Sequence, residues 1–100
     1  MNNLVILSGF ISNELELKEK NGTQWLSFGI AVHEKEGATF FDCIAFNANA
    51  KFIKEYFEKG SPISVQGKLK KSKWKNGKGE ERETFNIDIE KVNFVPTRKK

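Results

Sequence analysis

The densest chemical signal in the chain lies in residues 68–75, whose sequence is KLKKSKWK. This segment holds five lysines, no acidic residue and one tryptophan, Trp74, and it is followed by Asn76-Gly77. Positive charge holds phosphates, and a flat aromatic ring stacks on unpaired bases. The segment therefore favours a single-stranded nucleic acid as ligand. A solvated hairpin whose edge strand is guarded by lysines explains the same residues and stays open as the alternative.

The charge of the chain is unevenly distributed. Its formal net charge is +4, but residues 1–50 hold three basic and six acidic side chains, and residues 51–100 hold fourteen and seven. The basic residues gather at 68–78 and in Arg98, Lys99 and Lys100. This polarity predicts a polyanionic partner and salt-sensitive binding. The lack of a basic amphipathic helix argues against a membrane surface.

The residues that support catalysis or metal binding are few. Cys43 is the only cysteine and His33 the only histidine, which excludes an intrachain disulfide and a zinc site built from several thiolates. Asp42 and Cys43 are neighbours, so on a strand they point to opposite faces. We therefore expect no enzyme activity, no metal and no other cofactor.

Size and composition indicate one globular domain. A chain of 100 residues is long enough for one hydrophobic core and too short for two. Its apolar runs are only a few residues long, so we expect no membrane span. The start, MNNLVILSGF, lacks a basic leader and a long apolar region, and it resembles a first strand more than a signal peptide. We expect a cytoplasmic protein.

The elements that must position the basic segment are mostly strands. Residues 4–12 form a β-rich apolar run with a bulge or bend expected at Gly9, and residues 14–18 alternate acid with leucine, so they can extend that strand. After a turn at 21–22, residues 24–33 alternate with period two. Small residues on one face of this second strand leave room for a ligand against the backbone. They are Ser27, Gly29, Ala31 and His33.

The third expected strand, residues 39–46, carries aromatic residues on both faces. Phe40 and Phe46 alternate with Phe41 and Cys43. One face must enter the core, so the other exposes two phenylalanines unless a ligand, a second element or a second subunit covers them. Phe40 and Phe46 are therefore candidates for a binding surface.

One helix follows this strand. The apolar spacing predicts a helix over residues 47–59, with Asn47 or Asn49 as its N-cap and Gly60 as a left-handed stop. Its apolar stripe is expected to close an open end of a curved sheet.

Two more strands complete the pattern. Residues 63–74 return to alternation, with an inward face that carries Ile63, Val65, Gly67 and Leu69. A tip at 76–79 leads into residues 80–90, whose Phe85, Ile87 and Ile89 lie in register. The apolar parity then shifts to Val92 and Phe94, which predicts a bulge near Glu90-Lys91, and Pro96 is expected to end the strand.

This order of elements matches the OB-fold, an all-β, five-stranded Greek-key barrel with one α-helix between strands three and four. Three stretches resemble the bacterial and phage single-stranded DNA-binding (SSB) family: NLVILSGFIS, FDCIAFNANAKFIKEYFEKGSPISVQGKLKKSKWK and ETFNIDIEKVNFV. The resemblance covers residues 2 to about 95 and implies a DNA-binding domain over 1–96 with a basic end over 97–100. The most specific matches are Tyr56, Lys59, Gly60, Ser61, Val65, Gly67, Leu69 and Trp74.

The resemblance implies roles for the aromatic residues. Trp74 and Phe40 match positions where the family stacks aromatic rings on bases, and Phe46 matches a phenylalanine that packs against a base. Trp25 matches an aliphatic position, so we expect core or interface burial for it rather than stacking.

The resemblance also implies roles for lysines. Lys70 and Lys73 match basic positions that contact the nucleic-acid backbone. From charge alone we add Lys68, Lys71 and Lys75 to the expected binding residues.

The family's function, partners and tail supply further expectations. The resemblance implies sequence-independent binding and protection of single-stranded DNA in replication, recombination or repair, by a homo-oligomer that is a tetramer or a dimer. The loop at 33–38 lacks an aromatic residue that the family often has, which implies a smaller or weaker site. The chain ends without the family's acidic tip, so we expect no tail-mediated recruitment of enzymes. The alternative is a primosomal-type OB-fold accessory protein that acts mainly through protein–protein assembly.

Overall fold

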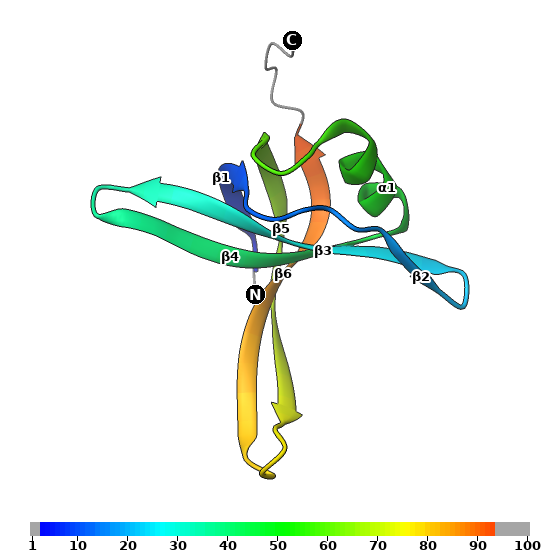
Figure 1. The fold of residues 1–100 in the computed structure, drawn as a ribbon, viewed down its shortest axis with the longest axis vertical. Helices are drawn as coiled ribbons and strands as arrows, with labels where there is room; N and C mark the ends of the chain where they lie inside the picture. Colours follow the sequence, from blue (N-terminus) through cyan, green and yellow to red (C-terminus); the bar gives the residue numbers. More distant parts are fainter. Residues whose placement is uncertain (1–2, 94–100) are drawn as a thin grey trace.

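The computed structural model describes residues 3–93, which fold into a curved sheet with one helix (Figure 1). Phe94, Pro96 and the basic end at 97–100 lie outside the described residues. The elements are β1 (Val5–Ile11), β2 (Lys18–Lys20), β3 (Thr23–Glu34), β4 (Gly37–Phe46), α1 (Asn47–Tyr56), β5 (Pro62–Lys75) and β6 (Glu81–Asn93).

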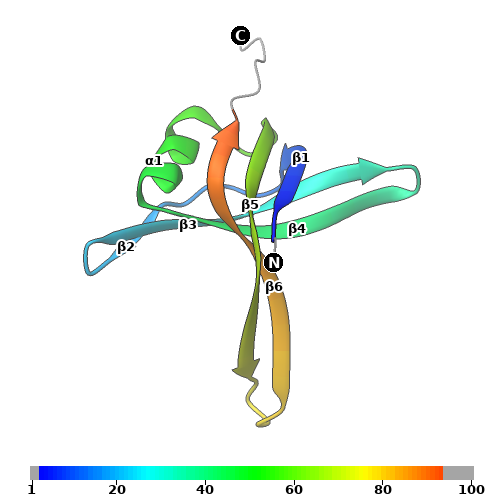
Figure 2. The same ribbon diagram turned by 180° about the vertical axis from the view of Figure 1, so that it is seen from behind.

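The sheet closes on itself. Its strand order is β1-β5-β6-β4-β3-β2, and β1 also pairs with β3, so β1, β5, β6, β4 and β3 form a ring. The short β2 pairs only with β3, outside this ring. Seen from behind, β1 lies beside β5 (Figure 2). The predicted all-β OB-fold with one helix is confirmed, with β2 as an added sixth strand.

The core fills the ring with branched aliphatic residues. Leu26 and Ile30 of β3 are fully buried, as are Val65 of β5 and Ile53 of α1. The helix packs against β3, β4 and β6 at one end of the ring. The apolar face of β3 lies in the core, because Leu26, Phe28 and Ile30 are all buried.

Glycines allow the sharp bends that closure needs. A Cβ atom at Gly9 would overlap the carbonyl oxygen of Ala31, at the point where β1 leaves β5 and meets β3. A Cβ atom at Gly67 would overlap the carbonyl oxygen of Asp88. The β5–β6 register shifts beside Gly67, so Glu90 of β6 has no partner residue on β5. The predicted bulge near Glu90 is confirmed.

The acid–leucine alternation suggests that residues 14–18 extend the first strand, and this prediction is wrong. Residues 14–17 belong to no strand, and Lys18 begins β2. They cross over the core instead, because Leu15 is buried and Leu17 packs against the core cluster. The ammonium of Lys54 donates a hydrogen bond of 3.1 Å to the Leu15 carbonyl and fixes this crossing.

The helix begins at Asn47 as predicted, but its predicted N-cap and its predicted end are wrong. Neither asparagine caps the helix: the N-cap is Phe46, without a side-chain hydrogen bond, and Asn47 accepts from the Gln24 N–H at 3.1 Å. The helix ends at Tyr56, since Phe57 turns to extended backbone and buries its ring. Gly60 does take the left-handed conformation, with φ of 92°, but in the turn that follows.

Beyond Gly67 the β5–β6 ribbon leaves the barrel as a long arm, drawn at the bottom of Figure 1. Leu69 was expected to point inward, but it is 44% exposed, and Phe85, which was expected in register with Ile87 and Ile89, is 54% exposed. Both side chains lie on the same face as Ile87, as alternation predicts, but no other element covers that part of the ribbon. The arm has two solvent-facing sides.

Candidate nucleic-acid interface

One face of β4 lies outside the barrel and carries the two candidate aromatic residues of that strand. Phe40 is 65% exposed and Phe46 is 40% exposed, whereas Cys43 and Ala45 on the other face are buried. The prediction that Phe40 and Phe46 share an exposed face is confirmed. Alternation along the strand produces this arrangement, because successive side chains point to opposite faces.

A groove of about 450 Å³ runs across the outer face of β3, β4 and β6. Phe40 and Ile44 supply its apolar wall, and Cys43 and Phe28 lie beneath. Its polar lining residues are Ser12, Asn13, Ser27, Asp42 and Asn86, and Gly29 completes the lining. Small side chains on β3 leave this space open, as their spacing in the sequence indicated.

The end of the groove at β3 is held by residues that follow β1. The Gly29 N–H donates to the Asn13 side-chain oxygen at 2.7 Å, and the Ser12 N–H donates to the Gly29 carbonyl at 2.9 Å. A Cβ at Gly29 would lie 2.5 Å from the Ser12 hydroxyl. Gly29 therefore permits the close approach of these two segments.

The face of the sheet that holds the groove continues, through paired residues of neighbouring strands, onto one side of the arm. Ile44 of β4 pairs with Asp88 of β6, and Asp88 pairs with Lys68 of β5. Two-residue steps along β5 then place Lys70 and Trp74 on the same face. Trp74 is 48% exposed and lies opposite Arg82, far along the arm. Neither Trp74 nor Phe46 lines the groove itself, so the structure brings only Phe40 into it.

The parity of β5 divides the candidate lysines between the two sides of the arm. Lys68 and Lys70 share the face of Trp74. The other three candidates lie on the opposite face and are Lys71, Lys73 and Lys75.

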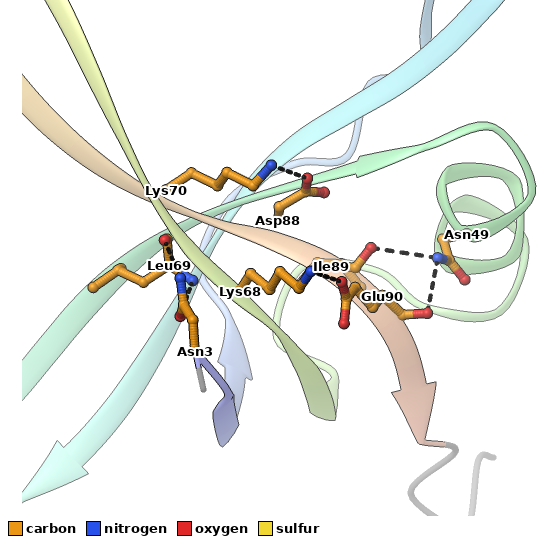
Figure 3. Close-up of polar contacts among 8 residues, drawn as sticks. All are labelled: Asn3, Asn49, Lys68, Leu69, Lys70, Asp88, Ile89 and Glu90. Atoms are coloured by element: carbon orange, nitrogen blue, oxygen red, sulfur yellow. Dashed lines mark hydrogen bonds and ion pairs between the residues drawn. The ribbon is translucent and has the colours of Figure 1, made fainter. Parts of the chain in front are cut away.

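Carboxylates from β6 neutralise part of this charge, which residues 68–75 taken alone do not reveal. Lys68 pairs with Glu90 and Lys70 with Asp88, each at 3.6 Å (Figure 3). On the other face Lys71 pairs with Glu83 at 3.8 Å. Exposed pairs of this kind contribute about 0–1 kcal/mol, so a phosphate can displace the carboxylate. Within residues 3–93, Lys73 and Lys75 form no ion pair.

The base of the arm is anchored to the chain start. The Asn3 side chain donates to the Leu69 carbonyl at 2.9 Å and accepts from the Leu69 N–H at 3.0 Å (Figure 3). On the other strand, Asn49 of α1 donates to the carbonyls of Ile89 and Glu90 at the bulge. Both strands of the arm are thus held where they leave the barrel.

Trp25 does not enter the core, so that part of its expectation is wrong. It lies on the outer face of β3, directly across from Phe46, and is partly buried. On the other side it pairs with Lys18 of β2. Burial of Trp25 against another subunit stays a prediction.

The residues considered for catalysis do not meet. Burial, with a further contribution from the charge of Asp42, raises the pKa of Cys43 to about 12, so Cys43 is a neutral thiol at physiological pH. His33 packs against the ring of Phe10, with ring centroids 5.5 Å apart. In residues 3–93 no group of three or more His, Cys, Asp and Glu side chains is arranged to hold a metal ion. The same residues include no helix long and apolar enough to cross a bilayer.

Several groove residues were not among the sequence candidates. The sequence indicated Ser27 and Gly29, because they belong to the face of their strand that carries small residues. Asn13 and Asn86 had none, since each reaches the groove only through strand pairing that the sequence alone does not specify. Asp42 was considered only as a catalytic group.

Comparisons with known proteins agree on one family. The model of the family described as "Single-strand binding protein family" matches residues 1–95. A single-stranded DNA-binding protein of Fusobacterium nucleatum is 33% identical over 102 residues, which cover 92% of this chain and 66% of that protein. One of Clostridium perfringens is 30% identical and is covered to 65%. The chain thus spans about two thirds of the length of these two relatives.

A shorter relative and a solved structure match over nearly their whole length. The single-stranded DNA-binding protein of onion yellows phytoplasma is 28% identical, with 98% of both chains covered. The crystal structure of the mitochondrial single-stranded DNA binding protein of S. cerevisiae superposes with a TM-score of 0.80 over 95% of this chain and 97% of the other. Its identity is 18%, so it supports the fold.

Proposed function

The chain belongs to the single-strand binding protein family, and from this premise we propose that it binds single-stranded DNA without sequence-specific recognition sites. Bases stack on Phe40, Phe46 and Trp74, and lysines of the arm hold the phosphates. The observation that carries the proposal is the exposure of Phe40 in an open groove whose face continues, through strand pairing, to Trp74.

The arm supplies the positive charge that the proposal needs. Residues 68–88 hold seven basic and four acidic side chains. The basic residues that we assign to phosphate contacts are Lys68, Lys70, Lys71, Lys73 and Lys75. Relatives named single-stranded DNA-binding proteins support the same ligand. We further propose that binding protects single strands during replication, recombination or repair, and that the protein is not an enzyme.

Titration with oligo-dT at several salt concentrations tests this proposal. We expect tryptophan fluorescence to fall on binding, because Trp74 stacks on a base. If three to five lysines neutralise phosphates, the logarithm of the affinity falls with the logarithm of the salt concentration with a slope of about −2 to −3.5. A duplex of equal length is the control and is expected to bind more weakly. Failure to bind oligo-dT at low salt would refute the proposal.

We also propose that the protein is a homo-oligomer, a tetramer or a dimer, that uses β1. Leu4 and Ile6 are 58% and 63% exposed. Strand β3 pairs with β1 only at Phe10 and Ile11, so over Val5 to Gly9 one edge of β1 carries no partner strand in the described part of the chain. Exposed apolar side chains beside an open edge favour pairing with a second copy.

Replacing Ile6 with glutamate is expected to lower the solution mass measured by light scattering, because a charge would be buried in the interface. Phe85→Glu is the matched change on another exposed apolar residue, 54% exposed on the arm, and is expected to leave the mass unchanged. A lower mass for Phe85→Glu and an unchanged mass for Ile6→Glu would contradict this proposal and place the interface on the arm.

The exposed aromatic residues of β4, Phe40 and Phe46, also support the second candidate function, an OB-fold accessory protein of the primosomal type that acts mainly through protein–protein assembly and uses these rings as subunit contacts. The two functions differ in the effect of Phe40→Ala. This change is expected to weaken DNA binding and leave the mass unchanged in a DNA-binding protein, and to change the mass in an assembly protein.

A further inference from the structure

An acidic residue lies in the middle of the groove. Asp42 is exposed on β4 between Phe40 and Ile44, and the polar side chains that share the groove with it are neutral. Its partner on β3 is Gly29, which has no side chain to cover the carboxylate. Within residues 3–93, Asp42 forms no ion pair and its carboxylate accepts no hydrogen bond. None of these contacts indicates that the Asp42 carboxylate stabilises the fold.

A carboxylate at this place constrains how a nucleic acid lies in the groove. It repels phosphates, and the lysines that attract phosphates lie on β5, which is separated from β4 by β6. Beside the groove, the sugar–phosphate backbone is therefore drawn toward β5, and the bases at this point lie over β3 and β4. This step rests on the proposed function.

The base stacked on Phe40 then presents its edge to Asp42. Side chains two residues apart on a strand lie about 7 Å apart on the same face, so the edge of a ring on Phe40 reaches the neighbouring carboxylate. Asn86 lines the groove on the β6 side, and its side-chain amide forms no hydrogen bond within residues 3–93. Asp42 and Asn86 are thus both available to the base.

We propose that Asp42 accepts a hydrogen bond from the exocyclic amino group of the base stacked on Phe40, so that this position favours cytosine, adenine or guanine over thymine or uracil. An ionised carboxylate is an acceptor only. Cytosine presents an N4 amino donor where thymine and uracil present the O4 acceptor, which a carboxylate repels. The protein binds any single strand, and the affinity varies with the base that is stacked on Phe40.

The test compares oligo-dC with oligo-dU, each of about 16 nucleotides, the upper range for one OB-fold. Their rings have the same size and differ at the edge that Asp42 contacts. The quantity measured is the affinity for oligo-dC divided by the affinity for oligo-dU. Asp42→Asn keeps an acceptor and adds a donor for O4, so it is expected to raise the affinity for oligo-dU. The ratio is expected to fall about fivefold or more.

Glu36→Gln is the matched control. Glu36 lies in the turn between β3 and β4, outside the groove, and it forms no ion pair in the described part of the chain. Loss of its charge is expected to raise both affinities by the same factor and leave the ratio unchanged. Asp42→Glu retains the charge and the acceptor and is expected to lower the ratio less than Asp42→Asn. Thermal unfolding of each variant checks that the fold is intact.

The outcomes separate this inference from the function on which it rests. If wild-type protein binds neither oligonucleotide at low salt, the proposed function fails. If it binds both and Asp42→Asn raises the two affinities equally, Asp42 acts only by repulsion and the inference alone is overturned. A selective gain for oligo-dU in Asp42→Asn, with none in Glu36→Gln, supports it.

Discussion

Replacement of Trp74 with alanine is expected to lower the affinity for single-stranded DNA by about one to two orders of magnitude. Stacking of one base on an aromatic ring contributes about 1–3 kcal/mol, which the substitution removes. Trp74 lies on an arm with no covering element and is 48% exposed, so its ring is available to a base. Fluorescence anisotropy of a labelled oligo-dT measures the change without relying on the tryptophan itself.

Phe85→Ala is the matched control for Trp74→Ala. Phe85 lies on the same arm and is 54% exposed, but its partner is Lys71, on the opposite face from the groove. This change is expected to leave the affinity within about twofold. Neither residue belongs to the core, so the melting temperature of both variants is expected to stay near that of the wild type. Equal losses of affinity would show that stacking is not confined to the ring of Trp74.

Alternation alone was sufficient to predict which residues of a strand share a face. Period two in residues 39–46 separated Phe40 and Phe46 from Cys43, and the structure buries and exposes them accordingly. The parity shift before Val92 likewise located the bulge at Glu90. These features depend on neighbours in the sequence and on one buried face, which is why local pattern was enough.

Features that depend on contacts between residues far apart in the sequence could not be predicted from the alternation of apolar residues. Leu69 continues the alternation of β5, but whether it is covered depends on how far the barrel extends, and the barrel ends at Gly67. The helix stops early because Phe57 turns back into the core. Likewise, Lys70 is neutralised by Asp88, which becomes its neighbour only through the register of β6.

The same limit applies to the groove. Phe40 had a sequence signal, whereas Asn13 and Asn86 come from segments more than 70 residues apart that meet only when the sheet closes on itself. The basic segment at 68–75 was recognised from charge, but its division into two faces follows from the extended geometry of the arm. The sequence therefore indicated which residues are exposed on the surface better than it indicated how they are arranged.

Gly67→Ala is expected to destabilise the fold by about 3 kcal/mol, the upper end for overpacking a buried site. The added methyl group would overlap the carbonyl oxygen of Asp88, and a backbone atom in a hydrogen-bonded ladder cannot rotate away as a side chain can. Gly67 also lies where the register of β5 and β6 shifts. In a chain of this size we expect the melting temperature to fall by more than about 10 °C, and denaturant unfolding gives the free energy.

Gly77→Ala provides the control within the same hairpin, because no heavy atom lies within 4 Å of the added methyl group and the backbone is not left-handed. This variant is expected to unfold like the wild type. If Gly67→Ala also does so, β5 and β6 can separate at the bulge without loss of packing, and the arm is joined to the barrel loosely. If it is destabilised as expected, the close contact of Gly67 with Asp88 contributes to holding the arm on the barrel.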